Sequence, residues 1–435
     1  MGLTSSSLTV DWCATMSVLR ARSGLTHVKG IYTRGHVQTR YRTHTTLVCE
    51  TCARKPGVDS RCPPRFSEGW RRDYFDFHVG IRTKYSRKHL PLNLGSRYQC
   101  SREAFEQAGY TPEESIQIMQ KSVKLADYAR KTYLAEESTV TPGPPTKEAF
   151  VALSLGPFGS AVFPPQDFDG LYPPPFGPKG PTKDGTGNTR LFSSDSGVVE
   201  EEEKAIEALA QFHLWRLHGV ASDSEVWNAV DYIAFETVPH LRELRAIKLA
   251  VARFDTDTHG GLGGLRGWWV SLVFPGGEES AQWGREEREH QARSLGLASP
   301  DQAEILNVLL DPKIGAVPTG LGLNCTMIDQ YPSILSSIIS SSKPKPTPGG
   351  KVPVPLTLVI YPNGGRPGDT FNTFTHRWEN DGGPRPDGRN VTWEEEVVEV
   401  VQKCRDEWKD VIVGGCCRVY PPQIKTLREK ANEVL

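Results

Sequence analysis

Short apolar runs and longer amphipathic segments alternate along the chain from about residue 145 to its end. The runs suit buried strands of a parallel sheet, and the segments between them carry apolar residues at helical spacing. The alternation predicts repeated βα units around one sheet. Six strands are expected, at residues 150–155, 232–235, 268–274, 316–323, 356–360 and 411–413.

Helices are expected between these strands because the apolar spacing changes to a helical period and capping signals precede it. Pro112 lies in the first turn of one segment, and four glutamates open another after Val198, where the helix dipole favours negative charge. Stretches rich in Pro, Gly, Ser and Lys predict surface loops at 164–188, 253–267 and 336–354. The expected helices span residues 115–133, 198–218, 239–251, 299–310, 392–409 and 423–432.

Each predicted strand ends in residues that packing alone would not select. Glu236 follows one strand, Asn324 and Cys325 follow another, and Cys416 and Cys417 follow the last. Parallel strands of a (β/α)8 barrel place their carboxyl ends on one face, where such enzymes carry their active sites. The pattern therefore predicts that these side chains gather at one end of a barrel.

The three thiols at strand ends favour a zinc site. Adjacent cysteines such as Cys416 and Cys417 do not easily bond to each other, but both can reach one soft metal ion. A third thiolate from Cys325 would leave one tetrahedral corner open, as in catalytic zinc sites. A lone cysteine is more often a small buried apolar residue, and Cys404, in the predicted helix 392–409, is expected to serve packing.

Composition describes an ordinary protein with a net charge of -1, but the charge is unevenly distributed. Residues 1–97 hold 17 Lys plus Arg against 6 Asp plus Glu, whereas the remainder is acidic. Residues 1–95 are expected to be an atypical, basic, poorly ordered segment, and residues 96–435 the barrel domain. No nucleic-acid module, membrane span or secretory signal is recognisable, and nine cysteines suit a reducing cytoplasm.

Six strand-end motifs in order give the chain a specific resemblance over about three quarters of its length. From Tyr98-Gln99 onward it resembles the zinc-dependent homocysteine S-methyltransferases that use S-methylmethionine or S-adenosylmethionine. The matching motifs are Ser154-Leu155-Gly156-Pro157-Phe158-Gly159, Phe235-Glu236-Thr237-Val238-Pro239, Ser271-Leu272-Val273-Phe274-Pro275, Gly322-Leu323-Asn324-Cys325-Thr326, Tyr361-Pro362-Asn363-Gly364 and Gly414-Gly415-Cys416-Cys417-Arg418.

The resemblance implies a (β/α)8 barrel with zinc on Cys325, Cys416 and Cys417, and an enzyme that methylates zinc-bound homocysteine thiolate to methionine. It also implies that Glu236 holds the homocysteine amino group and that Asn324 lies in the substrate pocket. The methyl group of a sulfonium donor is already activated, so no proton-transfer residue is expected beyond the zinc ligands. The choice between the two donors, a related betaine or folate donor, and the oligomeric state stay open.

The amino-terminal region departs from the family pattern. Family members carry Asp-Gly-Gly at the end of the first strand, and no such sequence occurs in residues 1–97. Strands one and two are therefore expected to be missing or replaced, together with an aspartate that would help to bind the amino acid. A lineage-specific replacement and a misassigned reading frame or retained intron are both open, and the composition favours the second. An inactive barrel remnant or binding protein is the alternative function.

Overall fold

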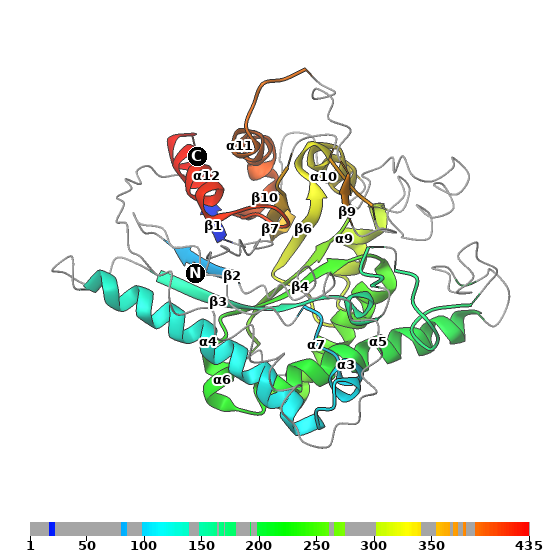
Figure 1. The fold of residues 1–435 in the computed structure, drawn as a ribbon. Helices are drawn as coiled ribbons and strands as arrows, with labels where there is room; N and C mark the ends of the chain where they lie inside the picture. The colour runs from blue at the N-terminus through cyan, green and yellow to red at the C-terminus, as the bar shows by residue number, and fades with distance from the viewer. Residues whose placement is uncertain are drawn as a thin grey trace, which may run out of the picture.

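The computed structural model describes residues 17–21, 80–84, 98–138, 148–162, 165–168, 170–179, 192, 198–260, 265–274, 302–340, 354–365, 369–372, 377–379 and 388–434. Eight of the strands in these ranges close a barrel in the order β1-β10-β7-β6-β5-β4-β3-β2 (Figure 1). Their bounds are β1 Ser17–Ala21, β2 Gly80–Lys84, β3 Glu148–Leu155, β4 Tyr232–Val238, β5 Gly267–Leu272, β6 Gly320–Met327, β7 Val354–Asn363 and β10 Trp408–Val413. Strands β8 (Thr370–Asn372) and β9 (Arg377–Glu379) form a separate antiparallel pair.

The six strands predicted from the apolar runs are β3 to β7 and β10, and all are parallel to their neighbours within this set. Their alternating side chains face two different environments. Leu153 and Ile233 belong to the large core between strands and helices, whereas Ala152 and Ala234 belong to a smaller cluster inside the barrel. The predicted barrel fold is confirmed.

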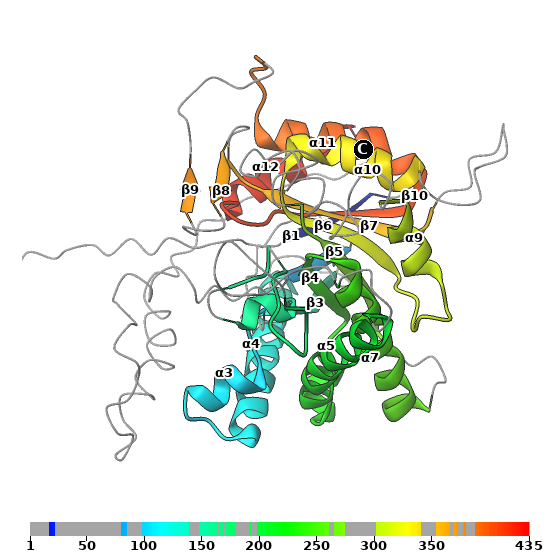
Figure 2. The ribbon, with the colours of Figure 1, turned by 90° about the vertical axis from the view of Figure 1, so that its right-hand side faces the viewer.

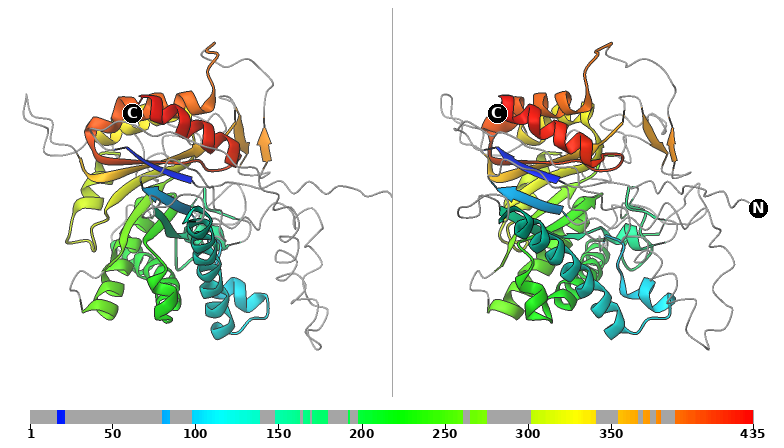
Figure 3. Two further views of the ribbon diagram at one scale, coloured as in Figure 1. Left: turned by 90° about the vertical axis from the view of Figure 1, so that its left-hand side faces the viewer. Right: turned by 60° about the vertical axis from the view of Figure 1, so that its left-hand side comes forward.

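Strands β1 and β2 occupy the two remaining places in the barrel, but in the opposite sense. They are parallel to each other, while β1 is antiparallel to β10 and β2 is antiparallel to β3 (Figure 3). The family's first two strands are thus replaced rather than missing. The proposed boundary at residue 95 stays a prediction, because the structure describes only these two strands within residues 1–97.

Helices lie outside the barrel in two groups (Figure 2). Helices α4, α5 and α7 lie beside β3 and β4, and α10, α11 and α12 lie on the opposite side, over β6, β7 and β10. Several predicted boundaries differ: α7 continues to His259 and α10 to Ser340, both into stretches expected to be loops, β6 begins at Gly320 and not at residue 316, and β10 begins at Trp408, within the stretch expected to be helical. The helix bounds are α3 Arg102–Gln107, α4 Pro112–Ser138, α5 Val198–Ala221, α6 Ser224–Asn228, α7 Leu241–His259, α9 Gln302–Leu310, α10 Tyr331–Ser340, α11 Trp393–Cys404 and α12 Pro421–Val434.

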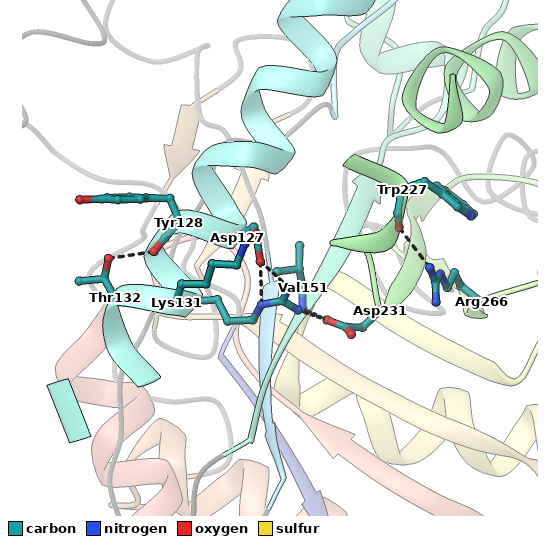
Figure 4. A network of polar contacts seen from close by, with 9 residues as sticks. Asp127, Tyr128, Lys131, Thr132, Val151, Trp227, Asp231 and Arg266 are labelled. Carbon is teal, nitrogen blue, oxygen red and sulfur yellow. Dashed lines mark hydrogen bonds and ion pairs between the residues drawn. The ribbon is translucent and has the colours of Figure 1, made fainter. Parts of the chain in front are cut away.

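Polar contacts tie α4 to the amino ends of β3 and β4 (Figure 4). The Arg130 guanidinium donates to Asp231 at 2.7 Å and also pairs with Asp127 on its own helix. The same Asp231 oxygen accepts the Val151 backbone N–H at 2.6 Å. Because this end of a (β/α)8 barrel lies opposite the active face, the network is expected to serve stability.

Among the described residues, no helix combines the length and the apolar character needed to cross a bilayer.

Candidate metal centre

Polar side chains inside the barrel gather at its carboxyl end. Ala152, Ala234, Val359 and Ile412 fill the interior with apolar side chains, and Trp269 packs among them. Two residues further along the strands, the same faces carry polar side chains: Ser154, Glu236, Ser271, Asn324 and Tyr361. The apolar layer fills the barrel below these buried polar side chains, as side chains do in other barrels of this size, and the polar layer is termed the pocket.

A β-bulge brings Cys325 into this pocket. The pairing of β6 with β7 shifts register between Asn324 and Met327, and Cys325 takes a left-handed backbone conformation with φ 51°. In a regular strand, neighbouring residues would face opposite sides of the sheet. The bulge re-aims Cys325, so that Asn324 and Cys325 both face the site.

The turn that carries Cys416 and Cys417 is fastened to the end of β7. The Gly414 N–H donates to Ile360 O at 2.7 Å and the Cys416 N–H to Pro362 O at 2.8 Å. In return, the Gly364 N–H donates to Cys417 O at 2.7 Å. The segment Tyr361-Pro362-Asn363 therefore positions two of the thiols.

Close packing accounts for the glycines around this turn better than a positive φ does. Arg418, not the glycine pair, takes the left-handed conformation, with φ 62°. A Cβ on Gly364 would lie 2.4 Å from Arg418 O, and a Cβ on Gly415 would lie 2.4 Å from the Val419 side chain. Any larger residue at either position would push the cysteine turn away from β7.

The three sulfur atoms lie close enough to share one ion. Cys325 Sγ is 3.0 Å from Cys416 Sγ and 3.9 Å from Cys417 Sγ, and all three ligand atoms lie within 4.8 Å of one another. Zinc–sulfur bonds of about 2.3 Å in a tetrahedron place sulfurs roughly 3.8 Å apart. The donor set and its spacing fit a thiolate-rich zinc site. Cys404, by contrast, is buried in the core among the helices, as predicted.

Asn324 and Thr237 surround the Cys325 sulfur with hydrogen-bond donors. The Asn324 amide nitrogen lies 2.7 Å from Thr237 Oγ1 and 3.3 Å from Cys325 Sγ, and its oxygen accepts the Thr237 backbone N–H at 2.8 Å. Thr237 Oγ1 lies 3.8 Å from the same sulfur. Asn324 is 2% exposed, so its amide is part of the protein interior.

Glu236 is a buried carboxyl on the neighbouring wall of the pocket. Ser154 Oγ donates to its Oε2 at 2.5 Å, and the side chain is 3% exposed. Burial, with a smaller contribution from the nearby Cys416 thiol, raises the pKa of Glu236 to about 8. A cation bound beside it would favour the ionised form.

Tyr98 completes the pocket from outside the strands. Its hydroxyl donates to Asp167 Oδ2 at 2.9 Å and is hydrogen-bonded to Thr237, and the electrostatic influence of Cys325 reaches it. Gly156 lies directly against Tyr98, because a Cβ there would be 2.4 Å from the Tyr98 carbonyl. In the sequence, Tyr98 was recognised only as a family marker. Thr237 was not identified as a site residue, although its position directly after Glu236 could have indicated it.

The structure thus brings together every residue that the sequence nominated for the site. The sulfurs of Cys325, Cys416 and Cys417 form one cluster, Asn324 contacts it, and Glu236 faces the same interior. Their roles as zinc ligands and substrate contacts stay predictions.

Comparison with known proteins gives consistent relatives. The family model described as homocysteine S-methyltransferase matches residues 94–431. A betaine-homocysteine S-methyltransferase of Drosophila melanogaster is 27% identical over 79% of this chain and 80% of its own length, and homocysteine S-methyltransferase 4 of Zea mays is 24% identical over 78% and 75%. The metallated form of the Escherichia coli homocysteine methyltransferase MmuM is 19% identical, with 77% of each chain covered and a TM-score of 0.41.

The match to the family model covers most of the chain and includes the three clustered thiols, Glu236 and Asn324. The family predicted from the strand-end motifs is therefore confirmed. The chain belongs to the homocysteine S-methyltransferase family, enzymes whose chemistry is the methylation of homocysteine.

Proposed function

We propose that this protein transfers a methyl group from a sulfonium donor, S-methylmethionine or S-adenosylmethionine, to homocysteine, with zinc held by Cys325, Cys416 and Cys417. The observation that supports it most is the cluster of three sulfurs within 4.8 Å at the carboxyl end of the barrel. The reaction forms a bond between the homocysteine sulfur and the methyl carbon. The bond from that carbon to the sulfonium sulfur breaks, and its electron pair leaves with the neutral thioether.

Zinc, when bound, supplies the means of holding a thiol as its thiolate near neutral pH, where free thiols with a pKa of about 8.5 are mostly protonated. Three protein thiolates leave one tetrahedral position for the substrate thiol. The proton released by homocysteine leaves before methyl transfer, and the departing thioether needs none. The reaction therefore depends on the alignment of the two substrates more than on a general acid.

Glu236 is proposed to receive the ammonium group of homocysteine. Its carboxyl group is buried in the pocket wall, and Ser154 holds one of its two carboxyl oxygens. Tyr361 also hydrogen-bonds to this carboxyl group, and an ammonium donor would add a charge-assisted hydrogen bond to it. Cysteine thiols at a metal site also suit a reducing compartment, so we place the enzyme in the cytoplasm.

One observation keeps the inactive or binding protein as a second candidate. Because β1 and β2 run antiparallel to β10 and β3, their carboxyl ends face away from the thiols. Among the described strands, no aspartate stands at the end of a first parallel strand. A protein that binds homocysteine without turning it over would follow if that aspartate were indispensable.

Metal analysis and a donor panel test the proposal together. The purified chain is expected to hold about one zinc, and Cys416→Ala to lose it. With homocysteine, methionine should form from S-methylmethionine or S-adenosylmethionine and more slowly from betaine. A zinc-free protein with full methyl transfer would refute the metal assignment, turnover with betaine alone would refute the donor class, and zinc binding without turnover would favour the second candidate.

A further inference from the structure

The ends of β4 and β6 share an unusual backbone feature. Each strand shifts register at its carboxyl end, and each has one non-glycine residue with a positive φ there, Thr237 at 58° and Cys325 at 51°. A β-branched residue such as threonine is a rare occupant of this region, because its Cβ substituents clash with the backbone. Such conformations persist only where the surrounding structure fixes them.

One amide group connects the two strained residues. β4 and β6 are not neighbours in the barrel, because β5 lies between them. The side chain of Asn324 nevertheless reaches over the end of β5 and makes two hydrogen bonds with Thr237, one to its N–H and one to its hydroxyl. Asn324 is therefore the direct link between the two bulged strand ends.

The hydrogen-bond chemistry fixes which way the amide points. A backbone N–H can only donate, so the atom 2.8 Å from the Thr237 nitrogen must be the Asn324 oxygen. The amide nitrogen then faces Thr237 Oγ1, Cys325 Sγ at 3.3 Å and Cys416 Sγ at 3.9 Å. Because Thr237 Oγ1 accepts from the amide, its own single hydrogen is shared between the Cys325 sulfur at 3.8 Å and the Tyr98 hydroxyl, which itself donates to Asp167.

We propose that Asn324, with Thr237, is a positioning residue for the thiol site and does not contact the substrate. Both amide hydrogens are directed at Thr237 Oγ1 and at the sulfurs, so the group has no donor left for homocysteine. The link holds Cys325 in its left-handed conformation and places hydrogen-bond donors beside its sulfur, which orients the sulfur toward the other two thiols. The inference rests on the proposed function only in that zinc occupies the three thiols.

Zinc affinity of the full chain tests this assignment without relying on turnover. Asn324→Ala removes the link, and Thr237→Val removes the hydroxyl while keeping a branched side chain. Both should weaken zinc binding about 10- to 100-fold in competition with a chromogenic chelator, as loss of groups that orient metal ligands does elsewhere. Thr237→Ser keeps the hydroxyl and should stay close to the wild type.

Thr326→Ser is the matched control on the same strand end. The Thr326 hydroxyl accepts from the Phe274 N–H and donates to the Asn324 carbonyl, without contact to a sulfur. Its serine variant retains these bonds and should bind zinc as the wild type does. If Asn324→Ala does not fold, as judged by circular dichroism, Thr237→Val answers the same question from the other end of the hydrogen bond.

The kinetic consequence separates positioning from substrate contact. For a positioning residue, excess zinc should restore most of the activity of Asn324→Ala, with the homocysteine KM near that of the wild type. Unchanged zinc affinity together with a raised homocysteine KM would overturn the inference and make Asn324 a substrate contact. A wild-type chain that binds no zinc would instead refute the proposed function, so the two failures are distinguishable.

Discussion

Acidification should destabilise the protein through one buried histidine. His213 on α5 lies between two charged groups, with Nδ1 2.6 Å from an Arg216 guanidinium nitrogen and Nε2 3.0 Å from Glu243 Oε1. The guanidinium can only donate, so Nδ1 must accept and the ring is the neutral tautomer with hydrogen on Nε2. All three side chains are fully buried.

The sign of the effect follows from the pKa of the ring. Burial, supported by the positive charge of Arg216, lowers the pKa of His213 to about 4 despite the opposing attraction of Glu243. The unfolded chain, with a histidine pKa near 6.5, therefore binds more protons between pH 6.5 and pH 4, and stability falls as the pH falls through that window. Between pH 7.5 and pH 5 the loss from this residue is about 2 kcal/mol.

His213→Gln isolates this contribution, because glutamine offers a donor and an acceptor but no proton-binding site. The free energy of unfolding of each protein is measured by urea titration at pH 7.5 and at pH 5. The decrease between the two pH values should be about 2 kcal/mol larger for the wild type than for His213→Gln. His218→Gln, at an exposed position of the same helix, is the control. Equal losses in the wild type and His213→Gln would refute the assignment of a neutral, proton-resisting histidine.

Three further substitutions probe the lower barrel, the cysteine turn and the pocket. Arg130→Ala should lower the free energy of unfolding by about 1–3 kcal/mol because it removes the ion pair of the partly buried Asp231 and one of the two ion pairs of Asp127, which keeps Lys131, whereas the exposed control Arg102→Ala should leave the free energy of unfolding close to that of the wild type in the same urea titration. Gly364→Ala should displace the Arg418 carbonyl and weaken zinc binding in chelator competition by about tenfold or more, and unchanged affinity would contradict the role assigned to close packing at this turn. Glu236→Gln should raise the homocysteine KM by about tenfold or more with zinc content unchanged, and an unchanged KM would exclude it as the ammonium site.

The parallel part of the barrel was predictable because its strands are covered on both faces. Runs such as Trp268–Phe274 are apolar apart from Ser271, and the segments between them keep a helical period. The boundaries of helices and strands were less predictable where the apolar spacing of a helix continues into a strand. Trp408 starts β10, although the apolar spacing of α11 leads into it through a single short turn of 3-10 helix.

The metal site was predictable in its ligands but not in the residues that hold them. Thiols that follow buried parallel strands, two of them adjacent, suit metal binding better than packing, so Cys325, Cys416 and Cys417 were evident from residue type and position. The bulge that turns Cys325 inward and the hydrogen bonds of Asn324 arise from pairing between distant strands. No local pattern in the sequence encodes that pairing.

The direction of β1 and β2 changes what the rest of the pocket must do. In an all-parallel barrel every strand presents its carboxyl end to the active face, so substrate groups can come from any of eight strands. Here two of the eight are reversed, and among the described barrel strands β3 to β7 and β10 present their carboxyl ends on the side of the thiols. Among the carboxyl ends of those strands, Glu236 is the one carboxylate. Recognition of the ammonium group would then depend on this residue far more than in a barrel that also carries an aspartate on its first strand.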